Sequence, residues 1–537
     1  MAQPQTSIQI QAPGFAGLNT QDSPIGMDLQ FAGNADNCVI DKFGRISSRK
    51  GLDALTDDPD ATGAIGDSHA ETAYEFTDTD GTRRIFFSGN LEGGSTASMW
   101  AQDEGGTATL MTGLSATNNN WAYASLSDQC FIAQEGEVVQ YTANGTSWQA
   151  MTQQPQVVAE PNIIIAGLGH LWVASSASKK SVIEWSTITT NSGLGGAATP
   201  WTGSGSGSLD IEEYWPNGTD TIEALAIHNN FLVIFGRSSI LVYVIPDTGT
   251  NVGPEFMSLS DTVNNMGCIA RDSVVSMGTD LLFLDSSGLR SLMRTVQEKS
   301  MPLGDMSMNV RDELRDTVLN ATGPIRAVYS PEEAFVALII PNVTVTADLT
   351  ATYVFDTRRP LESGALRATK WLGRELSCGV RTNSGKLLLG RPGGLYEYTG
   401  GSDTSLLMTE DATSGVDMNY ATRSQDFGEA SRFKFPKQID MILVGGSQFT
   451  LDVSWFYDFD NRANTKTLEY NTESGGIWNV AQWDIDQWGE SGGNILSTSV
   501  NLWGSGKNVL FRFQGTITDT PLSIQELNMN TLLGRIN

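Results

Sequence analysis

A pattern of short apolar strands separated by polar turns recurs along the middle of the chain, and it constrains the fold more than any other feature. Residues 224–244, ALAIHNNFLVIFGRSSILVYV, are an example. The pattern begins near residues 74, 123, 163, 224, 274, 328 and 380, so successive copies lie 40 to 61 residues apart. A repeat near 50 residues that is built from hairpins predicts an all-β fold with the blades of a β-propeller, about seven of them with six to eight allowed.

The physical reason for such a ring is burial. A four-stranded blade has two apolar faces, and it buries both only between neighbouring blades. A β-helix and two sandwiches in series are the alternatives, but a β-helix requires a shorter repeat. The ring is therefore the favoured architecture for residues 61–400.

The two ends of the chain lack the hairpin repeat of the middle region. Residues 1–60 contain prolines and many glycines, which argue against a long helix and predict an extended N-terminal arm, with a short helix conceivable only at 29–38. Because a polar extended segment gains little stability alone, we expect this arm to wrap a neighbouring subunit. Its deletion (residues 2–51) should then block assembly while leaving a folded propeller.

One helix is predicted inside the propeller region, at residues 306–319. Met306, Val310, Leu314 and Val318 recur every four residues and lie on one helical face. Asp305 precedes them and is a candidate cap. We interpret this helix as an insertion between blades.

The C-terminal region, residues 401–537, begins with a polar linker-like stretch to about residue 420. Alternating segments such as FTLDVSWFYDFD and NVLFRFQG follow. Alternation of apolar and polar residues is typical of half-buried strands and predicts a C-terminal β-sandwich.

The chain is strongly acidic, with a formal net charge of −28 and a pI near 4.4. Such a protein has no general affinity for the phosphate backbone of nucleic acids. The simplest interpretation of the charge is solubility. The more specific one is a surface along which DNA passes without binding.

Cysteine usage and hydropathy suggest a cytoplasmically folded protein. The four cysteines, Cys38, Cys130, Cys268 and Cys378, are far apart and form no CxxC pair, which predicts buried free thiols. The N-terminus lacks the basic and apolar regions of a signal peptide. No apolar stretch approaches the roughly 20 residues that span a bilayer.

Residues that could carry catalysis or hold a metal are sparse. His69, His170 and His228 are far apart and are predicted to be structural, and no nucleophile elbow, HExxH or P-loop motif occurs. Segments 77–81 and 458–461 resemble the start of a calcium loop, but no Glu follows at the twelfth position. Residues 203–207 form a Gly-rich loop without a following Lys. We therefore expect no enzymatic activity, no cofactor and no metal.

Three of the thirteen tryptophans, Trp478, Trp483 and Trp488, lie five residues apart in IWNVAQWDIDQWGE. Exposed indole rings stack on sugars, whereas the same residues in a sandwich fill the core between sheets. A core or subunit-interface position is the favoured interpretation.

Several segments resemble proteins of short-tailed bacteriophage (podovirus) tails. Residues 13–52 are similar to the opening of those proteins and carry the elements Asn37, Val39, Gly44, Arg45, Arg49 and Gly51. Residues 222–244 and 266–292 resemble a blade signature of the nozzle, or packaged-DNA stabilisation, hub proteins. The Trp-rich segment and the closing LSIQELNMN look like C-terminal parts of virion proteins. The order of these motifs along one chain carries the resemblance.

The resemblance implies a structural virion protein, the nozzle at the distal end of a short tail. Such a protein would form a homo-hexamer, attach to an adaptor or tail tubular ring, and hold tail fibres or spikes at its flank. It would be made in the host cytoplasm, close the DNA channel before infection and conduct DNA during ejection, with Gly-rich loops such as 203–208 as a movable gate. Asn37, Arg45, Arg49, Trp478, Trp483 and Trp488 are the candidate assembly residues.

Two other classes of function stay open on the sequence alone. One is a virion-associated propeller that degrades glycans with a pair of carboxylates. The other is a glycan-binding or receptor-binding protein that uses the Trp-rich segment.

Overall fold

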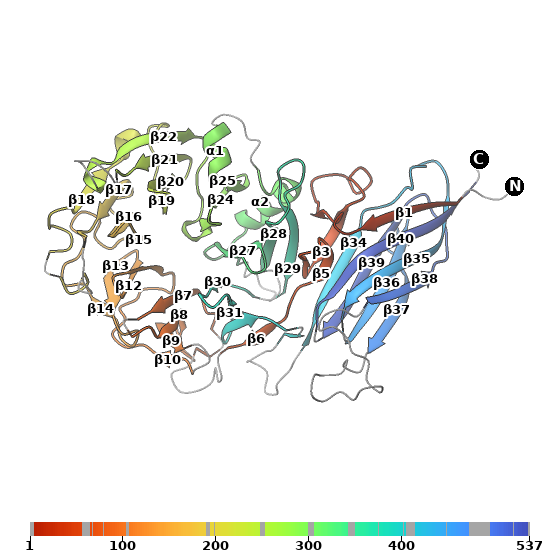
Figure 1. Cartoon of the computed structure of the whole chain (residues 1–537), viewed down its shortest axis with the longest axis horizontal. Coiled ribbons are helices and arrows are strands. Elements are labelled where there is room, and N and C mark those ends of the chain that lie inside the picture. The colour runs from red at the N-terminus through yellow and green to blue at the C-terminus, as the bar shows by residue number, and fades with distance from the viewer. Residues whose placement is uncertain are drawn as a thin grey trace.

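The structure is a computed structural model of the 537-residue chain. It describes residues 5–55, 65–66, 68–78, 80–103, 107–188, 194–197, 199–246, 253–298, 305–341, 350–373, 375–400, 402–403, 414–446, 448–471, 495–518 and 520–534. Strands dominate, and they form two bodies that lie side by side (Figure 1). We call the body with small sheets around an axis the ring, and the other the two-sheet body. Among the described residues, no helix is long and apolar enough to cross a membrane.

The first half of the ring consists of four antiparallel sheets, each built from four strands that follow one another in sequence. The first contains β7 (Thr72–Thr77), β8 (Arg83–Asn90), β9 (Ala97–Asp103) and β10 (Thr109–Leu110); the second β11 (Ala122–Leu126), β12 (Gln129–Gln134), β13 (Glu137–Thr142) and β14 (Gln149–Ala150); the third β15 (Ile163–Gly167), β16 (His170–Ala174), β17 (Val182–Trp185) and β18 (Gly207–Asp210); the fourth β19 (Ile222–His228), β20 (Phe231–Gly236), β21 (Ser239–Val244) and β22 (Ser258–Asn264).

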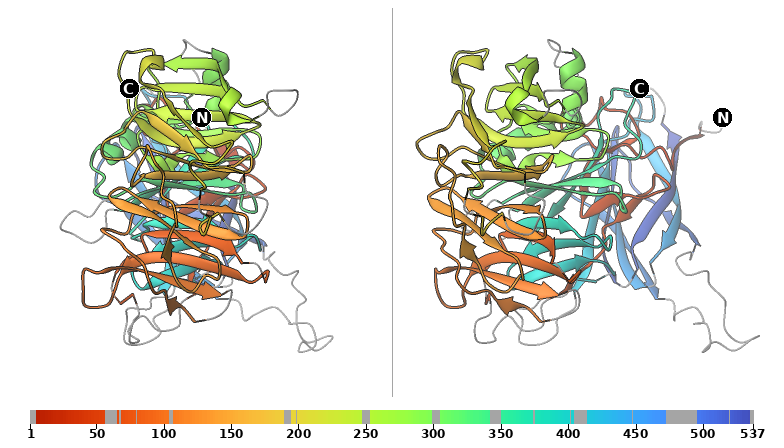
Figure 2. Two further views of the ribbon diagram at one scale, coloured as in Figure 1. Left: turned by 90° about the vertical axis from the view of Figure 1, so that its left-hand side faces the viewer. Right: turned by 60° about the vertical axis from the view of Figure 1, so that its left-hand side comes forward.

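The second half of the ring continues the order with three more groups of strands. They are β23 (Val275–Ser276), β24 (Leu281–Asp285) and β25 (Gly288–Ser291); β26 (Arg326–Ser330), β27 (Phe335–Ile340), β28 (Ala351–Asp356) and β29 (Arg367–Leu372); and β30 (Cys378–Arg381), β31 (Leu387–Arg391) and β32 (Gly394–Tyr398), joined by β6 (Leu52–Ala54). The views from the rim in Figure 2 show the sheets following one another from orange through yellow to green.

Tight turns explain why these segments fold as hairpins. In three sheets only two residues separate the first strand from the second, and both have positive φ. A two-residue turn with two positive φ angles matches the right-handed twist of the flanking strands. The residues are Ser127–Asp128, Leu168–Gly169 and Asn229–Asn230.

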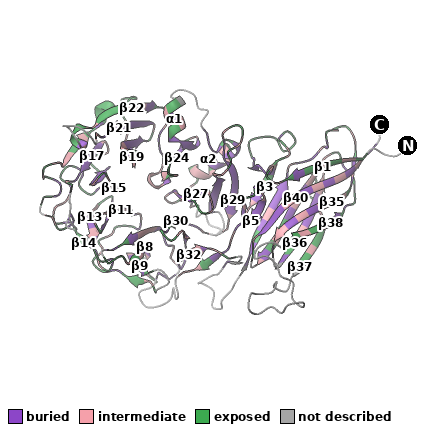
Figure 3. Ribbon diagram, in the orientation of Figure 1, coloured by how far each residue is buried: buried purple, intermediate pink, exposed green. Residues whose placement is uncertain are grey.

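Each sheet of the ring shares an apolar core with its neighbours, and the first sheet shares one with the last. Phe87 and Trp100 of the first sheet pack with Leu388 and Leu395 of the last. Phe335 and Trp371 pack with Leu387 and Tyr396 in the preceding gap. Buried residues therefore fill the gaps between sheets, whereas outer and edge strands such as β22 and β37 carry exposed ones (Figure 3). The ring is closed by packing as well as by hydrogen bonds.

Two short helices interrupt the ring. Helix α2 (Arg311–Leu319) follows a 3-10 turn (Met308–Val310) at the position where the sequence predicts a helix, and Val310 and Leu314 are fully buried. Asp305 accepts the Ser307 N–H at 2.9 Å and the Arg311 Nε–H at 2.7 Å, but the residue at the N-cap is Val310. Helix α1 (Leu292–Glu298) was not predicted.

The two-sheet body is built from both ends of the chain. One sheet has the order β38 (Ile495–Asn501), β35 (Lys434–Gly445), β40 (Leu522–Leu533), β5 (Ile46–Ser48), β4 (Cys38–Ile40), with β1 (Gln5–Gln11) also on β40. The other sheet continues the β26–β29 group of the ring, because β29 pairs in parallel with β3 (Phe31–Asp36). From β3 its order goes on as β34 (Ser414–Thr422), β39 (Val509–Thr518), β36 (Gln448–Tyr457), β37 (Asn464–Asn471); β2 (Gly17–Leu18) pairs with β3, and β33 (Ser402–Asp403) with β34. A common core that includes Ile439, Trp455 and Phe513 joins them.

The N-terminal segment, which the sequence predicts as an extended arm around a neighbouring subunit, is part of its own chain's sheets. Its strands pair within the chain: β1 with β40, β3 with β34, β5 with β40 and β6 with β32. The short helix conceivable at residues 29–38 is wrong, because 31–36 form strand β3. Deleting residues 2–51 would remove strands from both sheets of the two-sheet body, so a folded propeller is no longer the expected product.

A buried ion pair holds the segment at the junction of the two bodies. The two Nη atoms of Arg49 donate to both carboxylate oxygens of Asp403, at 2.9 and 2.6 Å. Only 1% of the Arg49 side chain and 3% of the Asp403 side chain is exposed. Asp403 also accepts the Leu52 N–H at 3.1 Å, which places it at the start of β6. The pair therefore orients β6 for its pairing with β32.

We expect Arg49→Ala to lower the free energy of unfolding by about 3–5 kcal/mol, because it leaves the buried Asp403 carboxylate without its bidentate partner. Denaturant unfolding monitored by tryptophan fluorescence measures the loss. Lys180→Ala, which removes an exposed pair with Glu135, is the control and should cost at most about 1 kcal/mol. Equal losses for the two variants would contradict the role of the buried pair.

Candidate functional site

A cavity of about 370 Å³ lies at the axis of the ring. It is lined by residues from the first strand of all seven groups, namely β7, β11, β15, β19, β23, β26 and β30. Its walls combine apolar side chains, Ile165 and Ile227 among them, with polar groups. The charged residues of its lining are Arg271, Asp272 and Arg326. These three are the natural candidates for a functional site.

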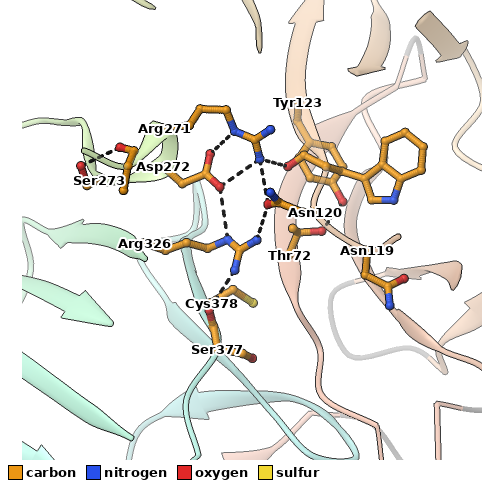
Figure 4. A network of polar contacts seen from close by, with 12 residues as sticks. Thr72, Asn119, Asn120, Tyr123, Arg271, Asp272, Ser273, Arg326, Ser377 and Cys378 are labelled. Atoms are coloured by element: carbon orange, nitrogen blue, oxygen red, sulfur yellow. Dashed lines mark hydrogen bonds and ion pairs between the residues drawn. The ribbon is translucent and has the colours of Figure 1, made fainter. Parts of the chain in front are cut away.

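Arg271 is the centre of the polar network in this cavity (Figure 4). It lies in a 3-10 turn (Arg271–Ser273) that leads to β23. Its Nε and Nη2 donate to the Asp272 carboxylate at 2.7 and 3.0 Å. Nη1 donates to the main-chain oxygen and Oδ1 of Asn162 at 2.8 and 2.9 Å, and Nη2 also to Asn120 Oδ1 at 3.0 Å. Every N–H of this guanidinium thus has a partner.

Arg326, the first residue of β26, approaches the same carboxylate from another sheet. Its Nε lies 3.4 Å from Asp272 Oδ2. Its Nη2 donates to Asn120 Oδ1 at 2.8 Å, and its Nη1 to the main-chain oxygen of Ser377 at 3.3 Å. Asn120 therefore accepts from both arginines, and the network joins segments of five different sheets near the axis.

The charge of Asp272 holds this network together. Burial would raise the pKa of its carboxyl group, but the adjacent Arg271 guanidinium, together with Arg326, holds the pKa below its ordinary value. The carboxylate is therefore charged throughout the neutral range. One negative group lies between two positive ones, which leaves a single excess positive charge in the cavity.

Hydroxyl groups line another part of the cavity. The Thr72 hydroxyl lies 2.7 Å from the Tyr123 hydroxyl and 2.5 Å from that of Ser88. The Tyr74 and Tyr123 rings stack with their centroids 5.2 Å apart. Burial raises the pKa of Tyr74 to about 12 and that of Tyr123 further. Both phenols are therefore neutral hydrogen-bonding groups near pH 7.

The cysteine in the lining, Cys378, is held as a thiol. Its Sγ donates to the main-chain oxygen of Ala70 at 3.0 Å. Burial raises its pKa to about 12, although Arg326 acts in the opposite direction. All four cysteines are buried free thiols, as the sequence predicted. The groups of this cavity thus provide hydrogen bonds and charge.

The three histidines lie apart from one another and have local partners. His170 Nδ1 lies 2.5 Å from the Ser186 main-chain oxygen, His228 Nε2 lies 3.1 Å from Asn229 Nδ2, and His69 Nε2 lies 4.0 Å from Glu375. Burial lowers the pKa of His170 and of His69. In the described part of the chain, no group of three His, Cys, Asp or Glu side chains is placed to hold a metal ion.

The two segments that resemble calcium loops are polar turns. Asp78 accepts backbone N–H groups of Asp80 and Thr82 at 2.9 and 3.1 Å and pairs with Arg84. Asp458 accepts the N–H groups of Lys507 and Asn508 at 2.6 and 2.9 Å. These carboxylates satisfy backbone donors, which is the usual role of Asp in turns.

The Gly-rich segment at 203–208 lies on the rim of the ring. It leads directly into β18, the outermost strand of its sheet. Ser206 Oγ donates to the Gly203 main-chain oxygen at 2.7 Å, and Trp185 Nε1 donates to that of Gly205 at 3.1 Å. The loop is thus anchored to its own sheet and away from the axial cavity.

The predicted assembly residues fall into three groups. Asn37 and Arg49 are buried at the junction of the two bodies, where Asn37 donates to the Asp417 main-chain oxygen at 2.9 Å. Arg45 lies in the turn after β4, 2.6 Å from Asp41 and 4.5 Å from the Phe43 ring centroid, and Phe43 is 56% exposed. Trp478, Trp483 and Trp488 lie outside the described residues. The structure thus brings Asn37 and Arg49 together, with Asn37 Oδ1 3.3 Å from Arg49 Nε.

Sequence reasoning missed the axial network. The adjacent pair Arg271 and Asp272, together with Arg326 and Asn120, come from three different repeats and share no motif. The one available signal is that each lies at or just before the first strand of its repeat. A charged residue there faces the axis once the ring closes.

No known family model matches the sequence, and no curated protein is detectably similar to it. Solved structures that resemble it include the WD40 β-propeller domain of Doa1, 9% identical with a TM-score of 0.33, covering 63% of this chain and 95% of that one. YCF48 bound to D1 peptide is 14% identical with a TM-score of 0.34, covering 68% and 100%. The exo-β-1,3-galactanase of Phanerochaete chrysosporium is 10% identical with a TM-score of 0.28, covering 81% and 99%.

We expect Asp272→Asn to lower the free energy of unfolding at pH 7 by about 2 kcal/mol, because two arginines lose a charged acceptor. A carboxyl group whose pKa is lowered by folding contributes stability that is present at neutral pH and lost as the pH falls through its folded-state pKa. The stability of the variant should therefore fall less steeply than that of the wild type on acidification below about pH 4. Denaturant unfolding over a pH series measures both effects.

The matched control is Glu92→Gln, which changes an exposed carboxylate to an amide in the same way. It should leave both the stability at pH 7 and its acid dependence unchanged. An Asp272→Asn profile parallel to that of the wild type would contradict the charge assignment.

Proposed function

We propose that this chain is a structural virion protein, the nozzle at the distal end of a short bacteriophage tail. In this proposal the ring is a seven-bladed β-propeller and the two-sheet body is a C-terminal β-sandwich. The seven groups of strands around one axis, each sharing a core with the next, support the blade number. The two stacked sheets with one core support the sandwich.

The observation that carries the proposal is the place of the tail-protein motif in the fold. Asn37, with φ of 51°, and Gly44, with φ of 74°, are turn positions that a bulkier residue would strain. Arg49 forms the buried pair with Asp403, and the Gly51 N–H donates to the Gly400 main-chain oxygen at 3.1 Å. Asn37, Arg49 and Gly51, three of the residues that carry the resemblance, thus lie at the junction between the two bodies.

The proposed mechanism is mechanical. A homo-hexamer attached to an adaptor or tail tubular ring surrounds the DNA channel, closes it before infection and passes DNA during ejection, with tail fibres or spikes at its flank. The axial network and the buried Arg49–Asp403 pair make each copy a stiff wall element. The net charge of −28 on every copy repels phosphates, so DNA slides along the wall and does not bind to it.

Immunogold electron microscopy of phage particles, with an antibody raised against this protein, tests the location. We expect gold only at the tip of a short tail, because the nozzle lies at the distal end of the channel. An antibody that was first absorbed with the purified protein is the control and should label nothing. Absence of gold from all intact particles would contradict the proposal and leave a glycan-binding or glycan-degrading propeller as the better candidate.

A further inference from the structure

Two edge strands of the two-sheet body contain no charged residue. Strand β1, QTSIQIQ, pairs on one side with β40, and β38, ILSTSVN, pairs on one side with β35. Among the described residues, no strand pairs with the outer edge of either. Proteins usually protect an edge strand with charged residues or proline. Neither strand carries any, whereas the edge strand β37 of the other sheet carries Lys466 and Glu469.

The two strands have the same pattern of burial. In β1, Thr6, Ile8 and Ile10 turn toward the core and the residues between them are exposed; in β38, Leu496, Thr498 and Val500 do the same. Both therefore present alternating inward and outward side chains with one buried residue near one end. If the strands pair antiparallel in a register that joins all seven residues, every inward residue of one faces an inward residue of the other.

The directions of the strands also fit. The order β38, β35, β40, β1 is antiparallel at every step. The two outer strands therefore run in opposite directions. When a second copy is placed beside the first by rotation about an axis roughly along the strands, its β38 lies antiparallel to β1 of the first. The sheet then continues from one copy into the next with its apolar face on the same side.

We propose that copies of this chain assemble head to tail by antiparallel pairing of β1 of one copy with β38 of the next. Such a contact joins two different surfaces and therefore closes into a ring when the rotation permits. Its backbone hydrogen bonds supply affinity in the manner of strand addition to a sheet edge. The inference rests on the proposed tail ring and names the surface through which that ring forms.

The charge of the protein favours these strands as the contact. Copies that each carry a net charge of −28 repel one another, and like charges placed across an interface are costly. An uncharged edge is where two such copies meet with the least repulsion. The nearby Asp440 carboxylate has hydrogen-bond donors of its own, because Asn530 donates to it at 3.0 Å and Ser499 at 2.7 Å.

Disulfide cross-linking of full-length chains tests the pairing. Ser7→Cys and Ser499→Cys lie opposite each other in the fully paired register, and serine to cysteine is nearly isosteric. The four native cysteines are buried, so they leave the new thiols as the reactive ones. We expect an oxidised dimer when the two variants are mixed, and a ladder of oligomers from the double variant. Ser7→Cys mixed with Thr467→Cys of β37 is the control and should give no cross-link.

Each other outcome overturns the inference. Cross-linking of Ser7→Cys with itself shows a two-fold contact. If no cross-link forms while native mass spectrometry shows a ring, another surface joins the copies. The proposed function then stands, but the inferred contact does not. A wild-type chain that is monomeric at its highest soluble concentration also rules out the contact. The tail-tip labelling experiment decides separately whether the proposed function fails with it.

A charge variant tests the same surface without new cysteines. Thr498→Lys places a lysine on the inward face of β38. In an unassembled copy, the lysine amino group can reach solvent past the edge of the sheet. Pairing would bury it without a partner, so association should weaken at least about 100-fold while the circular dichroism spectrum is unchanged. Thr467→Lys on β37 should leave association unaltered. Equal association of Thr498→Lys and wild type would overturn the inference.

Discussion

The closure of the ring by a strand from the other end of the chain is the constraint on which the rest of the structure depends. Strand β6 pairs with β32, so the last group of strands is completed by residues that precede the first. The Arg49–Asp403 pair fixes the start of β6. Hydrogen bonds and packing both close the circle, because the first and last sheets of the ring share an apolar core. The seven groups of strands then bring their first strands to one axis, where Asp272 and the two arginines connect residues at or just before the first strands of five groups.

The same segment makes the ring and the two-sheet body interdependent. Between the N-terminus and β6 the chain contributes β1, β3, β4 and β5 to the two-sheet body. The core of that body is continuous with the gap between two sheets of the ring, since Leu284 and Leu338 belong to the cluster that contains Trp455. A copy built in this way has little freedom between its two bodies. That stiffness suits a wall element of a channel, as proposed.

The spacing of apolar residues predicted those elements whose contacts lie close together in the sequence. Residues 224–244 form β19, β20 and β21, and the period of four at Met306, Val310 and Leu314 marks the turn and helix that they occupy. The N-terminal segment was harder, because its strands are short and polar and their partners lie hundreds of residues away. Strand β6 has three residues and no pattern of its own. The axial network could not be predicted from the sequence, because its residues become neighbours only when the ring closes.

Hydrogen–deuterium exchange of the intact protein tests the closure most directly. If β6 holds the ring shut, the hydrogen-bonded amides of Leu52–Ala54 should exchange as slowly as those of β31 in the same sheet. In the Arg49→Ala variant, the amides of both strands should exchange faster, and by a similar factor. If the amides of β6 exchange at once while β31 stays protected, the ring is held by packing alone and the N-terminal strand is not its closure.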